Sequence, residues 1–112
     1  MGSSQRERSI SHGIQTFLKT IGAACYSTEQ GYRPGRGGAR VTAGVPDLLI
    51  FLPEPSNLFM FVEVKSAKGR IRPAQAQFAE ECEKVGIPCP VWRDVRDAFD
   101  YLESIGHIEV PE

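Results

Sequence analysis

A pair of short apolar runs, residues 47–52 and 58–65, constrains the fold of this 112-residue chain more than any other feature. The segment between them, residues 53–57, contains two prolines, a serine and an asparagine, a composition typical of a turn. Two strands joined by a short turn pair in antiparallel fashion. Both runs are almost continuously apolar, so we expect both of their faces to be covered and the pair to be central in its sheet.

Three ionisable residues interrupt these runs. Asp47 opens the first run, while Glu63 and Lys65 close the second. Side chains two residues apart share one face of a strand, and folding back at the turn brings Asp47 beside them. Two neighbouring carboxylates repel each other unless a proton or a cation lies between them, and Mg²⁺ prefers such oxygen ligands. The backbone carbonyl of Val64 could add a further ligand. The alternative is an ordinary buried ion pair, although buried charges without a role are costly.

The rest of the chain predicts further elements on both sides of this hairpin. Helical spacing of apolar residues predicts a first helix over residues 6–21, and a strand can follow over 23–28. Pro73 is well placed to begin a second helix. An apolar segment with two prolines, residues 87–92, predicts a strand near a sheet edge, and Asp94 can cap a last helix. The predicted order is α-β-β-β-α-β-α in a single α/β domain that covers residues 1–112, with its core at about 10–105.

Positive charge gathers around the hairpin although the net charge of the chain is only −1. Residues 33–72 carry seven Lys or Arg and three Asp or Glu, whereas residues 73–112 carry three and nine. Two glycine-containing loops hold most of this basic charge, with Arg33, Arg36 and Arg40 in the first and Lys68, Arg70 and Arg72 in the second. A basic field around a small acidic cluster suits a polyanion and a cation. The alternative for the first loop is a solvated, flexible segment without a ligand.

The composition narrows the possible classes of protein. The three cysteines, Cys25, Cys82 and Cys89, are widely spaced among apolar neighbours and form no zinc pattern, so we expect buried, reduced thiols. A catalytic thiol paired with His12 or His107 has no motif to support it. No apolar run approaches the ~20 residues of a membrane span, and the polar N-terminus does not resemble a signal peptide. We therefore expect a cytoplasmic protein without a membrane partner.

The site residues resemble the signature of the PD-(D/E)XK nuclease superfamily. In finer detail, the chain resembles the virus-type replication-repair nuclease (VRR-NUC) family over roughly residues 10–102. Three elements carry this likeness: Gly-Val-Pro-Asp-Leu at 44–48, Glu-Val-Lys at 63–65, and a Gly-Arg loop that leads into a helix bearing Gln75. The resemblance implies a restriction-endonuclease-like fold with a mixed central sheet flanked by helices. It also implies hydrolysis of DNA phosphodiesters that depends on Mg²⁺ or Mn²⁺.

The resemblance assigns a role to each matching position. Asp47 and Glu63 correspond to metal ligands, Lys65 to the catalytic lysine, and Gln75 to a helix glutamine beside the site. The family usually has a metal-shell Glu on its first helix, where the register here places Ser9. Glu7, two residues earlier, is a candidate for that role, and His12 could substitute for it.

The resemblance also bears on partners. Small stand-alone members of the family resemble viral or mobile-element proteins that act as homodimers on branched DNA, which here would place the chain in the cytoplasm of a host cell. We therefore expect branched, flap or junction DNA as substrate and a second copy of the chain as partner, with the 87–92 strand and the last helix as possible dimer surfaces. The alternative is a DNA-binding module on the same fold without catalysis. An RNA-directed nuclease is a third reading, but no aromatic stacking motif of an RNA-binding domain is visible.

Overall fold

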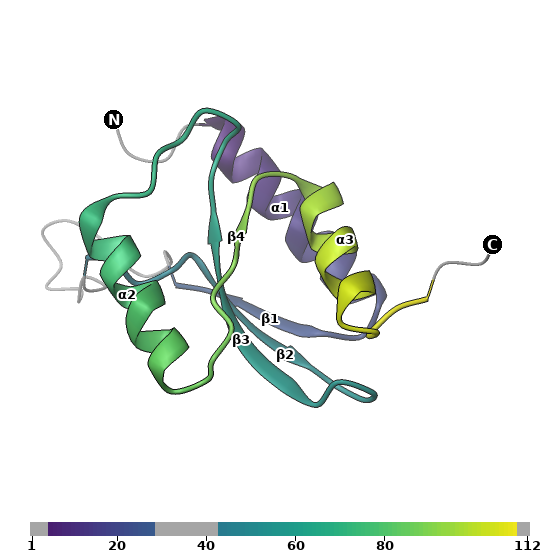
Figure 1. The fold of residues 1–112 in the computed structure, drawn as a ribbon. Coiled ribbons are helices and arrows are strands. Elements are labelled where there is room, and N and C mark those ends of the chain that lie inside the picture. Colours follow the sequence, from purple (N-terminus) through teal and green to yellow (C-terminus); the bar gives the residue numbers. More distant parts are fainter. Residues whose placement is uncertain (1–4, 29–42, 110–112) are drawn as a thin grey trace, which may run out of the picture.

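A computed structural model describes residues 5–28 and 43–109 and places three helices and four strands in the predicted order (Figure 1). The strands are short, and β2 and β3 match the two apolar runs. Among the described residues, no helix has the length and apolar composition needed to cross a membrane. The elements are α1 (Gln5–Thr20), β1 (Ala24–Ser27), β2 (Leu48–Leu52), β3 (Leu58–Val64), α2 (Pro73–Lys84), β4 (Val91–Trp92) and α3 (Val95–Ser104).

The four strands form one mixed sheet in the order β1-β2-β3-β4. The pairs β1–β2 and β2–β3 are antiparallel, and β3–β4 is parallel. The hairpin therefore is central, as predicted, and β4 is an edge strand. The prolines at this edge keep their carbonyls available, since Pro88 O accepts from Phe61 N at 3.0 Å and Pro90 O from Glu63 N at 3.0 Å. A proline cannot donate a ladder hydrogen bond, but it can still accept one.

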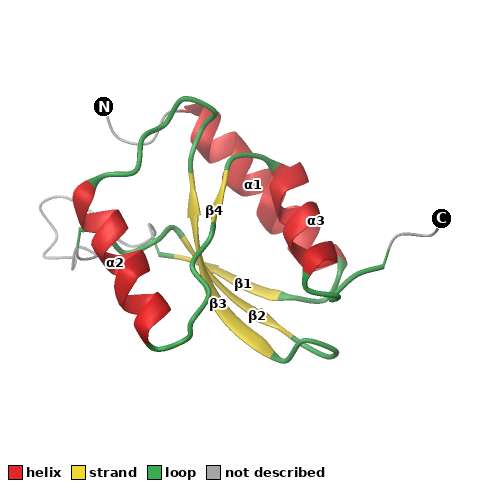
Figure 2. Ribbon diagram, in the orientation of Figure 1, coloured by secondary structure: helices red, strands yellow, loops and turns green. Residues whose placement is uncertain are grey.

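The core lies between one face of the sheet and the two helices α1 and α3 (Figure 2). The apolar stripe of α1 buries Ile14 and Leu18 completely, and α3 buries Ala98 and Leu102. Alternate residues of β2 and β3 meet these helices, because side chains of a strand alternate between its two faces. The buried residues of β2 and β3 in this core are Leu48, Ile50, Leu52, Met60, Val62 and Val64, and Trp92 of β4 joins them.

The described residues cover the opposite face of the sheet only in part. Helix α2 lies on this side, where Phe78 contacts Phe61 with 5.0 Å between the ring centroids. Farther along the sheet, 45% of Phe51 and 59% of Tyr26 remain exposed. The expectation that both faces of the hairpin are covered is therefore wrong at this end. The runs are continuously apolar because aromatic residues stand on this partly exposed face, not because a second face is buried.

Gly44 joins the hairpin to α2. Its φ of +94° is a conformation that side chains rarely adopt, and a Cβ at this position would lie 2.5 Å from the carbonyl oxygen of Ala74. Ala74 belongs to the first turn of α2, so the backbone before Asp47 packs directly on the helix that carries Gln75. A glycine is required here for two separate reasons, backbone strain and close approach.

We predict that Gly44→Ala destabilises the protein by at least about 2 kcal/mol, because strain and a backbone clash add together. Gly106→Ala is the matched control: Gly106 has a φ of +78°, but a Cβ there would meet nothing within 4 Å. That change should cost only about 1 kcal/mol, the cost of the backbone conformation alone. Chemical denaturation of the two variants measures the difference, and equal losses would contradict the proposed packing of residue 44 on α2.

Candidate active site

Asp47 lies one residue before β2 and is tied to the end of β3. Its Oδ2 accepts a hydrogen bond from the backbone N–H of Val64 at 2.8 Å. Its own carbonyl accepts from Thr28 N at 2.9 Å, and the Thr28 hydroxyl donates to Pro46 O at 2.7 Å. The hairpin thus brings Asp47 to the Glu63–Lys65 segment, as its antiparallel geometry predicts. Thr28, which no motif in the sequence marks, holds the aspartate backbone in place.

Glu63 and Lys65 are buried together at the end of β3. Only 6% of Glu63 and 8% of Lys65 are exposed, and Lys65 Nζ lies 3.8 Å from Glu63 Oε2. Gln75 on α2 donates from Nε2 to the same carboxylate oxygen at 3.1 Å. The Oε1 atom of Gln75 accepts from Arg72 N at 2.8 Å, which fixes the amide at the start of the helix. The structure therefore brings together the four residues Asp47, Glu63, Lys65 and Gln75.

The carboxylate of Glu63 is in an unfavourable position for a negative charge. Burial and the nearby charge of Asp47 raise the pKa of Glu63 from 4.5 to about 8, and a hydrogen bond with the Asp47 side chain acts in the same direction. Lys65 lowers this pKa, and Glu7 raises it further. The second oxygen, Oε1, is buried and finds no hydrogen-bond donor among the described residues. A buried, unpartnered acceptor is rare and costly in a folded protein.

Glu7, on α1, also lies near the Glu63 carboxylate. Its Oε2 lies 3.5 Å from the backbone nitrogen of Ser66, directly after Lys65. It is close enough to Glu63 to raise the pKa of that carboxyl. Ser9 and His12 are both exposed. Of the two first-helix candidates, Glu7 and His12, Glu7 is the one that the structure places beside the cluster.

The donor set suits a hard divalent cation. Asp47 and Glu63 supply carboxylate oxygens, one of which lacks a partner, and such oxygens are the ligands that Mg²⁺ and Mn²⁺ prefer. The pairing of β2 with β3 ends at Leu48 and Val62, so Val64 lies beyond the paired residues. The carbonyl of Val64 is on the same edge of β3 as its N–H group, which donates to Asp47. Within residues 5–28 and 43–109, no three Asp, Glu, His or Cys side chains form a ready metal cluster.

The predicted DNA-contacting residues divide into two groups. Lys68, Arg70 and Arg72 are exposed on the segment between β3 and α2, next to the carboxylates in the chain. Arg33, Arg36 and Arg40 lie outside the described residues. Arg93 is a further basic residue near this segment, and no motif in the sequence marks it. Its guanidinium contacts backbone carbonyls of residues 66–69, and a lone arginine directly after an apolar strand was the only signal in the sequence.

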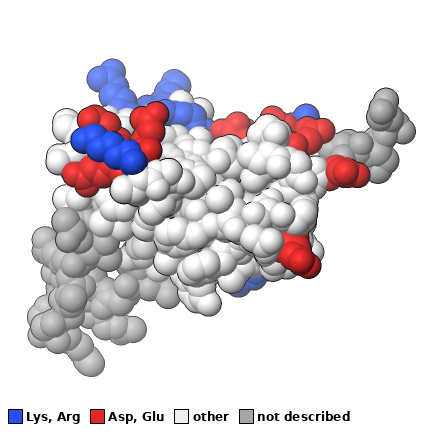
Figure 3. Space-filling view, turned by 60° about the horizontal axis from the view of Figure 1, so that its bottom comes forward, with Lys and Arg blue, Asp and Glu red and all other residues white. Residues whose placement is uncertain are grey.

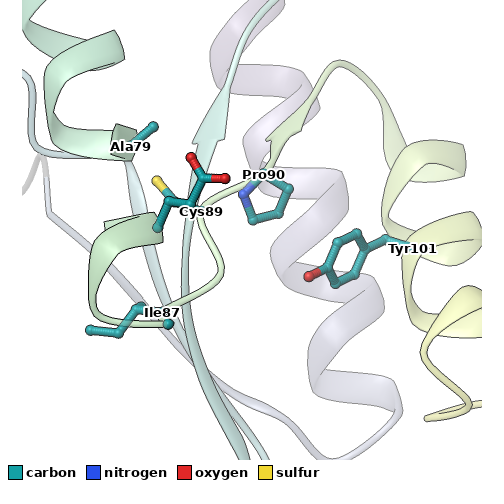
Figure 4. Close-up of a pocket in the computed structure, with 7 residues that line it drawn as sticks. Ala79, Ile87, Cys89, Pro90 and Tyr101 are labelled. Carbon is teal, nitrogen blue, oxygen red and sulfur yellow. The ribbon is translucent and has the colours of Figure 1, made fainter. Parts of the chain in front are cut away.

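The thiols and one pocket lie outside the carboxylate cluster, although Cys89 is near enough to Glu63 for that carboxylate to raise its pKa. Burial raises the pKa of Cys25 to about 11, and burial together with Cys82 raises the pKa of Cys89 to about 12, which disfavours a thiolate nucleophile. His107 Nδ1 is 2.7 Å from the hydroxyl of Ser56. Residues of α2, α3 and the segment 86–90 line a hollow of about 490 Å³. Figure 4 shows Cys89 and Tyr101 at this hollow. None of the clustered carboxylates lines that hollow.

Comparison with known proteins agrees with this geometry. A family model described as the VRR-NUC domain matches residues 36–95, which is slightly more than half of the chain. A solved structure titled "VRR_NUC domain" superposes with a TM-score of 0.67 at 23% sequence identity. The match covers 95% of this chain and all of that one, and at this identity it shows a shared fold. No curated protein matches the sequence.

We predict that Glu63→Gln stabilises the protein in EDTA, increasingly so as pH rises. A raised pKa in the folded state means that the stability contributed below pH 4.5 is lost as pH rises through about 8. Glutamine removes this titration and can still accept from Gln75. The variant's advantage in unfolding free energy should therefore exceed about 1 kcal/mol at pH 9, because one pKa unit corresponds to about 1.4 kcal/mol.

The control for this measurement is Glu103→Gln, which alters an exposed glutamate on α3. Denaturant unfolding between pH 5 and pH 9 compares both variants with the parent protein. The Glu103 variant should show a difference that does not change with pH. A difference for Glu63→Gln that is equally independent of pH would contradict the description of Glu63 as a buried, destabilised carboxylate.

Proposed function

This chain belongs to the VRR-NUC domain family, and we propose that it is a Mg²⁺- or Mn²⁺-dependent DNA endonuclease selective for branched or junction DNA. The observation that carries the proposal is the buried Glu63 carboxylate, which lies next to Asp47 and Lys65 and keeps one oxygen without a hydrogen-bond donor among the described residues. A divalent cation would compensate the charge that the fold leaves unbalanced.

Each residue of the cluster has a chemical task in this proposal. Asp47, Glu63 and the Val64 carbonyl would hold the cation, with Glu7 as a further ligand. When bound, the cation supplies positive charge that stabilises the negative charge developing on the phosphoryl oxygens. Lys65 orients the attacking water and counters the same charge, since its ammonium is buried beside Glu63.

Gln75 keeps the Glu63 carboxylate in one orientation through its amide hydrogen bond. Hydrolysis joins the water oxygen to phosphorus and breaks the bond from phosphorus to the leaving oxygen, which takes up a proton.

The basic segments supply contacts to the DNA backbone. Lys68, Arg70 and Arg72 are exposed and follow Lys65 within seven residues of the chain, so their positive charge would be available to the phosphates of DNA bound at the carboxylates. We include Arg33, Arg36 and Arg40 in this proposal, because they occupy the segment that precedes the Asp47 motif in the sequence. Contacts of this kind bind phosphates without reading the base sequence. Selectivity for branched DNA would then arise from the shape of the substrate.

We predict that Asp47→Asn and Lys65→Ala each lower the cleavage rate by at least about 100-fold, the usual effect of removing a positioned catalytic group. Asparagine can still accept the hydrogen bond from Val64, so this variant tests the charge more than the fold. Lys84→Ala, which removes an exposed lysine at the end of α2, is the control. Cleavage of duplex, flap and four-way-junction DNA with Mg²⁺, Mn²⁺ and Ca²⁺ gives the rates, and circular dichroism checks folding. Unchanged cleavage in both site variants would refute the assignment.

The second candidate function is a DNA-binding module without catalysis, which would use the same basic residues. The complete Asp47, Glu63 and Lys65 set argues for the nuclease, because a binding module gains nothing from buried carboxylates. Binding of junction DNA without cleavage under every metal condition would favour the module. Parallel assays with RNA substrates separate a nuclease that acts on RNA.

We also propose a second copy of the chain as partner, docked on the open aromatic face of the sheet. Rings follow one another from α2 to the edge strand: Phe78–Phe61 at 5.0 Å, Phe61–Phe59 at 5.2 Å, Phe59–Phe51 at 5.3 Å and Phe51–Tyr26 at 6.1 Å between centroids. Exposed aromatic residues of this kind are enriched at protein interfaces.

We favour a second copy of the chain over DNA at the aromatic face, because its rings carry no charge. Seen from the hairpin end of the sheet, the protein shows a broad area without Lys, Arg, Asp or Glu (Figure 3). An area without charge offers little to a DNA backbone, whereas a twofold axis would pack the aromatic face of each copy on the other. The surfaces predicted from sequence fit less well, because Trp92 is only 2% exposed and α3 packs on α1. Two copies would also provide the two active sites needed to cut both strands of a junction.

We predict that the double change Tyr26→Ser and Phe51→Ser weakens self-association by at least about tenfold, because two aromatic anchors are removed from the interface. Val85→Ser is the matched control, since Val85 is 71% exposed and lies outside the row of rings. Sedimentation equilibrium measures the dimer dissociation constant of each protein. A parent protein that remains monomeric, or a double variant that associates as tightly as the parent, would contradict this partner.

A further inference from the structure

Arg93 binds backbone carbonyls with its guanidinium group. It directly follows β4, and its Nη1 donates to Ser66 O at 2.7 Å and Gly69 O at 2.8 Å, with Ala67 O at 3.3 Å. These carbonyls all belong to the turn that follows Lys65. In the described part of the chain, no ion pair joins Arg93 to an acidic side chain. The guanidinium group therefore binds the backbone of one turn.

The backbone of Arg93 is held by a residue of α3. Arg93 N donates to Asp97 Oδ2 at 2.8 Å, and Asp97 N donates to Asp94 Oδ1 at 2.8 Å. Asp94 is the N-cap of α3, and this helix packs on α1 within the core. The arginine therefore connects the rigid core layer with the 66–69 turn. The planar guanidinium is suited to holding several acceptors in fixed directions.

The turn held by Arg93 bears directly on the candidate active site. A Cβ at Gly69 would lie 3.2 Å from Glu7 Oε2 and 3.3 Å from Lys65 Cδ, so the turn is packed against both side chains. Ser66 N lies 3.5 Å from the same Glu7 oxygen, and Lys65 N donates to Trp92 O at 3.1 Å. Movement of this turn would therefore displace the Lys65 stem and the Glu7 carboxylate together.

We propose that Arg93 is a positioning residue for the reaction: by clamping the 66–69 turn onto β4, its guanidinium fixes where Lys65 and Glu7 stand in the site. The effect of Arg93 on catalysis rests on the proposed nuclease function, whereas its hold on the 66–69 turn does not. Arg93 uses both hydrogens of Nη1 in the two short bonds to the turn, so its effect is transmitted through the backbone. A small displacement of a catalytic group is enough to lower a rate strongly.

The test compares Arg93→Met and Arg93→Lys with Arg96→Met. Methionine keeps the length of the side chain without its donors, and lysine keeps the charge with a smaller, differently shaped donor group. Arg96 is the control because its side chain is 75% exposed and pairs with Asp100 at 3.0 Å on α3. Hydrogen exchange of the metal-free protein is followed at the amide of Gly69, which donates to Ser66 O at 3.0 Å. Steady-state cleavage of a four-way junction then gives kcat and KM separately.

We expect Arg93→Met to accelerate exchange at Gly69 by about tenfold or more and to lower kcat by a similar factor, with KM changed less than about twofold. Arg93→Lys should lie between this variant and the parent, and Arg96→Met should match the parent. Unchanged exchange at Gly69 would overturn the clamp even in an active nuclease. A raised KM with unchanged kcat would also overturn the proposal, because it would identify Arg93 as a direct contact to DNA.

Two further outcomes are decided in the same experiment. If the protein does not cleave DNA at all, the exchange measurement still tests the clamp, while the nuclease function fails by itself. If Arg93→Met does not fold, Arg93→Lys is read by the same criteria of exchange and kcat. If neither variant folds while Arg96→Met does, Arg93 is a general stabilising residue, and its assignment as a positioning residue is wrong.

Discussion

The candidate site is built on two ionisable groups that are buried at the end of one central strand, at a cost to the stability of the fold. Glu63 and Lys65 are each less than 10% exposed, although burying charge carries a large desolvation cost. Neighbouring elements compensate this cost only in part: Gln75 donates from α2, and the Lys65 ammonium lies 3.8 Å from the carboxylate. One carboxylate oxygen still finds no donor in the part of the chain that the structure describes. The fold thus leaves a local excess of negative potential, which is the condition for cation binding.

The two faces of the sheet differ in what they contact: one packs in the core, and the other carries the candidate site. Along β3, Val62 and Val64 point into the core with α1 and α3, while Glu63 points to the side of α2. The packed side is a rigid support, and the other side carries the site at one end and exposed aromatic rings at the other. Polar groups in the site are therefore positioned by apolar packing that lies directly behind them. Arg93 extends the same support to the turn after Lys65.

The sequence predicted the element order, the hairpin and the meeting of Asp47 with Glu63 and Lys65, because strand alternation and a short turn leave little geometric freedom. The partly exposed aromatic face of the sheet could not be predicted, because an apolar run has the same sequence pattern whether a helix or solvent covers it. Arg93 was missed because its acceptors are carbonyls more than twenty residues away, which carry no sequence signal. Glu7 was one of several candidates, and only the packing of α1 against residues 66–69 distinguishes it.

The most direct test of the central claim is the anomalous scattering of Mn²⁺ in crystals of the protein. A manganese ion bound by the site should give a peak within about 2.0–2.2 Å of one oxygen of Asp47 and one oxygen of Glu63, the range expected for a small divalent cation on oxygen ligands. The peak should be absent in crystals of Asp47→Asn grown under the same conditions. A parent crystal with manganese bound only at other residues, or with none at millimolar concentration, would contradict the account.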